Sequence, residues 1–141
     1  MNEPTIQLTG NTTGEVDLRY SPSGKPVARF TVACNPRRLD TATDTWIDGT
    51  PSFWPCEIWG PMAEHLADSV TKGDRVTLTG RVRANVWTPT DGDNAGTEQR
   101  RLDVIVDEIG PSLRFRPAKP VKTDRATTTS DPTAGSDGAP F

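Results

Sequence analysis

The sequence predicts an all-β domain with one short helix, followed by a disordered C-terminal tail. Apolar residues alternate with polar ones in several short segments, which is typical of half-buried strands, whereas one segment has helical spacing. Residues 117–141 hold mostly Pro, Thr, Ala, Gly, Ser and Asp. Such a segment cannot bury enough apolar surface to offset the entropy lost on ordering. We therefore place one domain at residues 1–116 and a disordered tail at 117–141.

The first part of the domain contains three expected strands and a long connection. Alternation runs through residues 5–9, is weaker over 16–20, and returns over 28–34, where Ala, Phe, Val and Cys alternate with polar residues. The sequence Ser-Pro-Ser-Gly at 21–24 predicts a turn. Residues 35–51 are polar and broken by Gly and Pro. We expect them to form a long loop or a mobile hairpin, which is often functional in a small domain.

The next expected strand begins at Phe53, and its alternation separates two faces. Phe53 and Trp59 lie on one face, whereas Trp54 and Cys56 lie on the other. Cys34 also falls on an inward position of its strand. Two interpretations of the cysteines stay open: small core residues, or a bridge within or between subunits, which spacing alone does not decide.

The last part of the domain contains the single expected helix and two more strands. Pro61 suits the first turn of a helix, apolar residues at helical spacing follow, and Gly73 marks its expected end. Alternation then runs over 76–87, and the final barrel strand covers 102–106. Three strands, one helix and two strands are the order of a five-stranded Greek-key OB-fold barrel.

Charge and composition exclude several function classes. The net charge is −3, and residues 1–116 hold 13 Lys and Arg against 16 Asp and Glu, so a nucleic-acid site requires a local concentration of cations. The single histidine and two distant cysteines provide no metal site. Asp91 and Asp93 have the character of turn residues, so we expect no enzyme activity and no cofactor. No signal peptide or long apolar run is present, which predicts a soluble, cytoplasmic protein without membrane contact.

The strand over 76–87 carries the most informative surface. Its alternation places Arg81, Arg83 and Trp87 on one outward face, and Phe53 and Trp59 share the outward face of the neighbouring strand. Cations beside flat aromatic rings suit single-stranded DNA, which presents phosphates next to unstacked bases. The alternative is that the aromatic residues line a subunit interface or pack under the long loops.

Several motifs of this sequence, taken together and in their order along the chain, resemble those of bacterial single-stranded DNA-binding proteins. The matching segments are GN at 10–11, LRYSPSG at 18–24, VARFTVA at 27–33, IWG at 58–60, KGDRV at 72–76, GRV at 80–82 and the terminal PF. The run VDEIGPSLRF at 106–115 resembles the actinobacterial branch. This resemblance implies a homotetramer of OB-folds that binds and protects single-stranded DNA during replication, recombination and repair, in the nucleoid.

The resemblance also implies roles for individual residues. Phe53, Trp59 and Trp87 match its stacking positions, and Trp54 matches a subunit contact. The segment at 109–115 matches one that clamps a neighbouring subunit. The complete set of expected DNA contacts is Arg19, Arg29, Arg37, Arg38, Trp46, Phe53, Trp59, Lys72, Arg81, Arg83 and Trp87, and the expected subunit contacts are Trp54, Ile109 and Leu113.

Two departures from the family pattern stand out. Arg38 occupies a stacking position on the long loop, where Trp46 either compensates or packs down on that loop. The family's tail ends in an acidic run followed by Pro-Phe, which docks on replication and repair proteins, but here only Asp137 precedes Pro140 and Phe141. A phage-encoded or secondary copy is one explanation. The rival function is an OB-fold module whose aromatic surface binds protein, with DNA binding reduced or lost.

Overall fold

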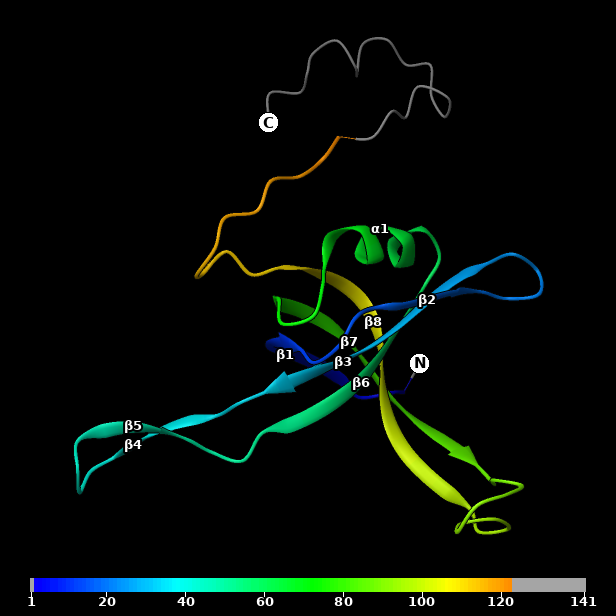
Figure 1. Ribbon diagram of the computed structural model, residues 1–141, viewed down its shortest axis with the longest axis horizontal. Helices are drawn as coiled ribbons and strands as arrows, with labels where there is room; N and C mark the ends of the chain where they lie inside the picture. Colours follow the sequence, from blue (N-terminus) through cyan, green and yellow to red (C-terminus); the bar gives the residue numbers. More distant parts are fainter. Residues whose placement is uncertain (1, 123–141) are drawn as a thin grey trace.

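The computed structural model describes residues 2–122 as nine elements, one of which is a helix (Figure 1). Most of the expected tail, including Asp137, Pro140 and Phe141, lies outside the described residues. In chain order the elements are β1 (Thr5–Thr12), β2 (Asp17–Tyr20), β3 (Pro26–Cys34), β4 (Arg37–Asp40), β5 (Thr45–Asp48), β6 (Ser52–Trp59), α1 (Pro61–Ser69), β7 (Arg75–Trp87) and β8 (Gln99–Pro111).

The expected barrel of five strand positions is confirmed. The main sheet has the order β1-β7-β8-β6-β3-β2, and an additional pairing between β1 and β3 closes it. The end of β1 and the whole of β2 both pair with β3, with Thr12 opposite Val32 and Asp17 opposite Arg29. These two short elements therefore share one position in the barrel. With the helix between the third and fourth positions, this is the OB-fold arrangement.

Two glycines permit the close strand crossings of the barrel. Gly10 lies where β1 passes from β7 to β3, and a Cβ there would collide with the carbonyl oxygen of Ala33. Gly80 lies in β7, where a Cβ would approach the carbonyl oxygen of Ile105 to 2.5 Å. Glycine is needed at both positions because the neighbouring atoms are backbone and have little freedom to move.

The barrel encloses one apolar core, and α1 covers an end of it. Ala63 and Leu66 of α1 are buried, as are the inward residues of the strands. Cys56 belongs to this core, and its burial raises the pKa of the thiol to about 12, so the thiol stays protonated at neutral pH. Cys34 is half-buried, and both cysteines are free. Cys56 therefore follows the core interpretation. The strand core residues are Leu8, Ala28, Phe30, Val32, Cys56, Ile58, Val76, Leu78, Val104 and Val106.

The helix begins as the sequence predicts but ends earlier. Pro61 lies in its first turn, where the missing N–H of proline has no helical partner to lose. The last helical residue is Ser69, and Val70 already has an extended backbone. Gly73, the expected end, lies instead in the turn that follows, with a positive φ of 89°. The helix is shorter because Val70 points into the core as extended chain.

The last strand is longer than predicted and contains a bulge. β8 pairs with β7 from Gln99 to Pro111, so the beginning of the segment at 109–115, which resembles a subunit clamp, is strand. The pairing shifts at Asp107, because Gly80 lies opposite Val106 and Thr79 lies opposite Glu108. One extra residue reverses the alternation beyond it.

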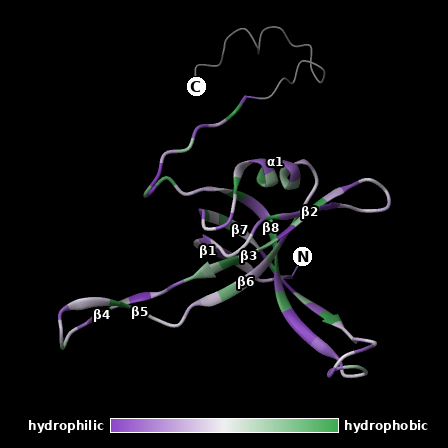
Figure 2. Cartoon of the chain, in the orientation of Figure 1, coloured by the Kyte–Doolittle hydropathy of each residue, from purple (hydrophilic) through white to green (hydrophobic). Residues whose placement is uncertain are grey.

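Two hairpins project from the barrel, as Figure 1 shows. One is β4–β5, which forms a separate two-stranded sheet. Of the two alternatives expected for residues 35–51, a long loop or a hairpin, the structure thus shows the hairpin. The other projecting hairpin, which we call the β7–β8 ribbon, consists of residues 82–87 and 99–104. In Figure 2, β8 is strongly hydrophilic along this ribbon. Within residues 2–122 no helix is long and apolar enough to cross a membrane.

Candidate nucleic-acid interface

Residues that pair directly across neighbouring strands share a face of the sheet. One such row crosses β2, β3, β6, β8 and β7, and we call the face that it defines the outer face. The row consists of Asp17, Arg29, Glu57, Ile105 and Arg81. Alternation along each strand places the other predicted contacts of β2, β3, β6 and β7 on the same face. These contacts are Arg19, Phe53, Trp59, Arg83 and Trp87.

The three predicted stacking aromatics are all exposed on the outer face. Phe53 exposes 60% of its surface, and Trp59 and Trp87 each expose 41%. Lys25 holds its ammonium 5.6 Å from the ring centre of Trp59, and the indole N–H of Trp59 donates to Glu57. A half-exposed ring with a cation beside it can accept a base and a phosphate together.

Trp87 lies on the β7–β8 ribbon against a cation that the sequence analysis missed. The guanidinium of Arg101 lies 5.6 Å from the ring centre of Trp87. Asp103 is buried and accepts hydrogen bonds from Arg101 Nε at 2.6 Å and from Asn85 Nδ2 at 3.1 Å. The hydrogen bond to Asp103 raises the pKa of Arg101. Alternation on β8 was the available signal, because Leu102 and Val104 share one face and leave Arg101 and Asp103 on the other.

Arg81 and Arg83 meet carboxylates from both ends of the domain. Glu3 accepts from Arg81 Nη1 at 3.2 Å and from Arg83 Nε at 2.9 Å. Asp107, the bulge residue, lies 3.1 Å from Arg81 Nη2. The hydrogen bond from Arg83 lowers the pKa of the Glu3 carboxyl. The hydrogen bond to Asp107 raises the pKa of the Arg81 guanidinium. These four residues form a network at the base of the ribbon.

The remaining predicted cations of the outer face are also paired. Arg29 Nε lies 3.2 Å from Glu57 Oε1, its direct partner across β3 and β6. Arg19 Nε lies 3.1 Å from Asp17 Oδ1 on the same strand. The outer face therefore combines exposed aromatic rings with arginines that each already contact a carboxylate. Exposed pairs of this kind are weak and open to exchange.

The β4–β5 hairpin carries three further predicted contacts, Arg37, Arg38 and Trp46. Trp46 exposes 61% of its surface and lies opposite Leu39 in the β4–β5 pairing, so its side chain is not buried against the segment expected to form a loop or a hairpin. Arg37 Nε lies 3.2 Å from Asp48 Oδ1. Arg38 lies on β4 opposite Ile47. The hairpin thus presents an exposed tryptophan away from the outer face of the barrel.

The last predicted DNA contact, Lys72, does not belong to any of the strands that form the outer face. It belongs to the turn between α1 and β7, where its backbone N–H donates to Glu15 at 3.2 Å. Within residues 2–122 no group of three His, Cys, Asp or Glu side chains could hold a metal ion.

The predicted subunit contacts differ in how far they are buried. Trp54 and Ile109 are partly buried against the core, and Trp54 Nε1 donates to Ser52 Oγ at 3.0 Å. Leu113, beyond the end of β8, is exposed. The segment that contains it leans on its own barrel, since the guanidinium of Arg75 lies 5.3 Å from the ring centre of Phe115.

Comparison with known proteins gives consistent results. A family model described as the single-strand binding protein family matches residues 3–112. The chain is 40% identical to the single-stranded DNA-binding protein of Paenarthrobacter nicotinovorans over 138 residues, covering 98% of this chain and 78% of that protein. It is 42% identical to that of Mycolicibacterium smegmatis over 124 residues, covering 88% and 73%. The crystal structure of a small single-stranded DNA-binding protein from Streptomyces coelicolor matches with a TM-score of 0.64 at 27% identity, covering 80% of this chain and 97% of that one.

Proposed function

This chain belongs to the single-strand binding protein family, and from that premise we propose that it binds single-stranded DNA without reading base sequence. The observation that carries the proposal is the outer face, where Phe53, Trp59 and Trp87 are exposed among arginines. The finer proposal is protection of unpaired DNA during replication, recombination and repair, in the cytoplasm, without catalysis and without a cofactor.

Stacking and phosphate contacts make different contributions to such binding. Each base that stacks on an aromatic ring contributes about 1–3 kcal/mol and depends little on base identity. Each phosphate that pairs with a cation releases counterions, so this part of the affinity falls as salt rises. Trp59 and Trp87 would supply the first contribution, and Arg29, Arg81 and Arg83 the second. Trp46 and Arg37 would extend the path along the β4–β5 hairpin.

A second function, binding of a protein partner at the same aromatic face, is favoured by one observation. The outer arginines pair with the domain's own carboxylates, which reduces the positive field that a DNA strand would meet. Aromatic residues and arginine are also enriched at protein interfaces. The two functions differ in their response to salt.

A tryptophan fluorescence titration with oligo-dT at several salt concentrations tests the main proposal. Bases that stack on Trp59 and Trp87 quench their emission, and the affinity should fall as salt rises. A titration that shows no quenching and no salt-dependent affinity would contradict DNA binding and support the protein-binding alternative. Double-stranded DNA of equal length serves as the control ligand.

We further propose that the active form is a homotetramer. The support is Leu113, exposed beyond β8, and Trp54, only partly buried on β6. Trp54→Ala and Leu113→Ala should each shift the oligomer toward smaller species in light scattering. An unchanged mass for both variants would contradict the assignment of these residues to assembly.

The C-terminal residues are proposed to recruit replication and repair proteins. Asp137, Pro140 and Phe141 keep the Pro-Phe end with one acidic residue. A chain that lacks residues 137–141 should retain its oligo-dT affinity, because the proposed DNA contacts all lie within residues 19–87. A large loss of affinity would assign the tail to DNA binding instead.

A further inference from the structure

We propose that Glu3 competes with DNA phosphate for Arg81 and Arg83, so that this carboxylate limits the affinity of the outer face for single-stranded DNA. This inference depends on the proposed function and specifies which groups control it. It concerns the network at the base of the β7–β8 ribbon. There, one carboxylate occupies the donors of two neighbouring cations.

The geometry of the network is that of an occupied phosphate site. Glu3 Oε1 lies 3.2 Å from Arg81 Nη1, and Glu3 Oε2 lies 2.9 Å from Arg83 Nε. The two oxygens of one anion thus bridge two guanidinium groups on the same face of β7. Phosphate oxygens use the same N–H donors at similar distances. Glu3 is ionised at neutral pH, as an ordinary glutamate is, and the hydrogen bond from Arg83 lowers its pKa further.

The backbone beside Glu3 is held in place, so the carboxylate returns to the same position. The N–H of Val82 donates to the carbonyl oxygen of Pro4 at 2.9 Å, which attaches the chain next to Glu3 to β7. Release of the two arginines therefore requires a rotation of the Glu3 side chain and no loss of backbone pairing. The carboxylate would move into solvent as a phosphate takes its place.

Arg81 and Arg83 differ in this exchange, because Asp107 pairs with Arg81. Asp107 lies 3.1 Å from Arg81 Nη2 and remains there when Glu3 leaves, whereas Glu3 is the carboxylate that pairs with Arg83 in residues 2–122. Exchange should therefore free Arg83 more completely than Arg81. Because Arg83 is also the more exposed of the two, it is the cation that gains most from loss of Glu3.

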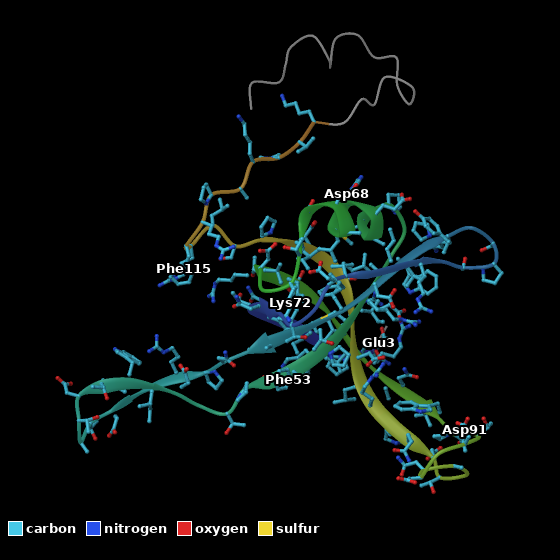
Figure 3. The ribbon with its side chains drawn as sticks, viewed as in Figure 1. Glu3, Phe53, Asp68, Lys72, Asp91 and Phe115 are labelled. Atoms are coloured by element: carbon cyan, nitrogen blue, oxygen red, sulfur yellow. The ribbon has the colours of Figure 1, made fainter. Side chains whose placement is uncertain are left out.

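The experiment compares Glu3→Gln with Asp68→Asn, which removes the same charge from α1. Figure 3 shows Asp68 on the helix and Glu3 beside the barrel strands. Glu3→Gln should bind oligo-dT about two- to fivefold more tightly at low salt, the range expected for an exposed ion pair. Its log–log salt slope should become steeper by about 0.7, the value for one further phosphate contact on a single strand. Asp68→Asn should stay within about twofold, since its charge is distant and screened.

A double-mutant cycle identifies the cation concerned. The gain from Glu3→Gln should largely disappear in an Arg83→Ala background, because the freed donor is then absent. Asp107→Asn should increase affinity in the same direction through Arg81, which provides a second test if Glu3→Gln disturbs the fold. Thermal melts followed by circular dichroism compare the folds.

Two kinds of failure can be told apart. If wild type binds oligo-dT and Arg83→Ala weakens binding, but Glu3→Gln equals Asp68→Asn or binds more weakly, the inference is wrong and Glu3 instead positions the arginines. If wild type shows no salt-dependent binding to oligo-dT, the proposed function fails, and the inference fails with it.

Discussion

The two halves of β7 follow one alternating pattern but have different surroundings. In the first half, Val76 and Leu78 are buried, and Thr77 and Thr79, which alternate with them, are exposed. In the second half, Val86 and Trp87 lie on opposite faces and are both exposed. The difference arises because β1 pairs with β7 only as far as Arg81, so the remainder pairs with β8 alone. Alternation therefore identifies the two faces of a strand but does not show whether either face is covered.

This difference separates the two tasks of the strand. The barrel half encloses the core and determines stability, whereas the ribbon half presents side chains to solvent and to the proposed ligand. Substitutions in the barrel should change the free energy of unfolding, and substitutions on the ribbon should change binding.

The largest effect is expected where the core is fully enclosed. Ile58→Ala on β6 removes a side chain with no exposed surface and should lower the free energy of unfolding by about 2–5 kcal/mol, because it leaves a cavity. Urea unfolding followed by circular dichroism measures this. A loss below about 1 kcal/mol would mean that the barrel core is much looser than its burial indicates.

A second prediction concerns the close crossing within β7. Gly80→Ala should cost about 1–3 kcal/mol, because its Cβ would lie 2.5 Å from the carbonyl oxygen of Ile105. Gly110→Ala is the matched control, since no atom beyond its two chain neighbours lies within 4 Å of its Cβ position, and it should stay within about 0.5 kcal/mol. If both variants lower the free energy of unfolding by the same amount, the cause is the replacement of glycine within a strand, and not the close contact with Ile105.

Substitutions on the ribbon half of β7 should change the affinity for DNA and leave the free energy of unfolding almost unchanged. Trp87→Ala should weaken oligo-dT binding by about 1–3 kcal/mol through loss of one stacked base, and the unfolding midpoint should change little. Fluorescence anisotropy of a labelled oligonucleotide measures the affinity. Trp46→Ala is the companion variant on the other hairpin. If Trp87→Ala keeps wild-type affinity, the ribbon has no role in stacking.

The smallest effect is expected on the apolar side of the ribbon. Leu102 is exposed opposite Ala84, so Leu102→Ala should change the free energy of unfolding by at most about 0.5 kcal/mol in the isolated subunit. Measured over a range of protein concentrations, a larger and concentration-dependent loss would show that a second subunit covers this face.

Much of the fold could be predicted because it depends on local patterns. Alternation located the barrel strands and placed Phe53 and Trp59 on one face, and Pro61 marked the start of the helix. The bulge at Asp107 and the early end of the helix could not be predicted. The bulge depends on the register in which β7 and β8 pair, and the helix ends where Val70 enters the core; no local signal in the sequence specifies either contact.

The candidate site was predicted only in part for the same reason. The outward cations Arg81 and Arg83 followed from alternation, but Glu3 lies before the first strand and reaches them only through the barrel pairing. Arg101 and Asp103 were missed although the alternation of β8 contained the signal. Whether these side chains bind DNA stays a prediction.

The pairing of β1 with β7 has a consequence for how the chain folds. Apart from Thr12, every residue of β1 pairs with β7, which lies far away in the sequence. Sheets built from such distant pairings form in milliseconds to seconds, much more slowly than helical bundles. During synthesis, β1 emerges from the ribosome well before β7 has been made. Until then, most backbone N–H and C=O groups of β1 lack their hydrogen-bond partners. The nascent chain thus carries an unpaired segment with strand-forming sequence, which favours association between chains, until β7 has been synthesised.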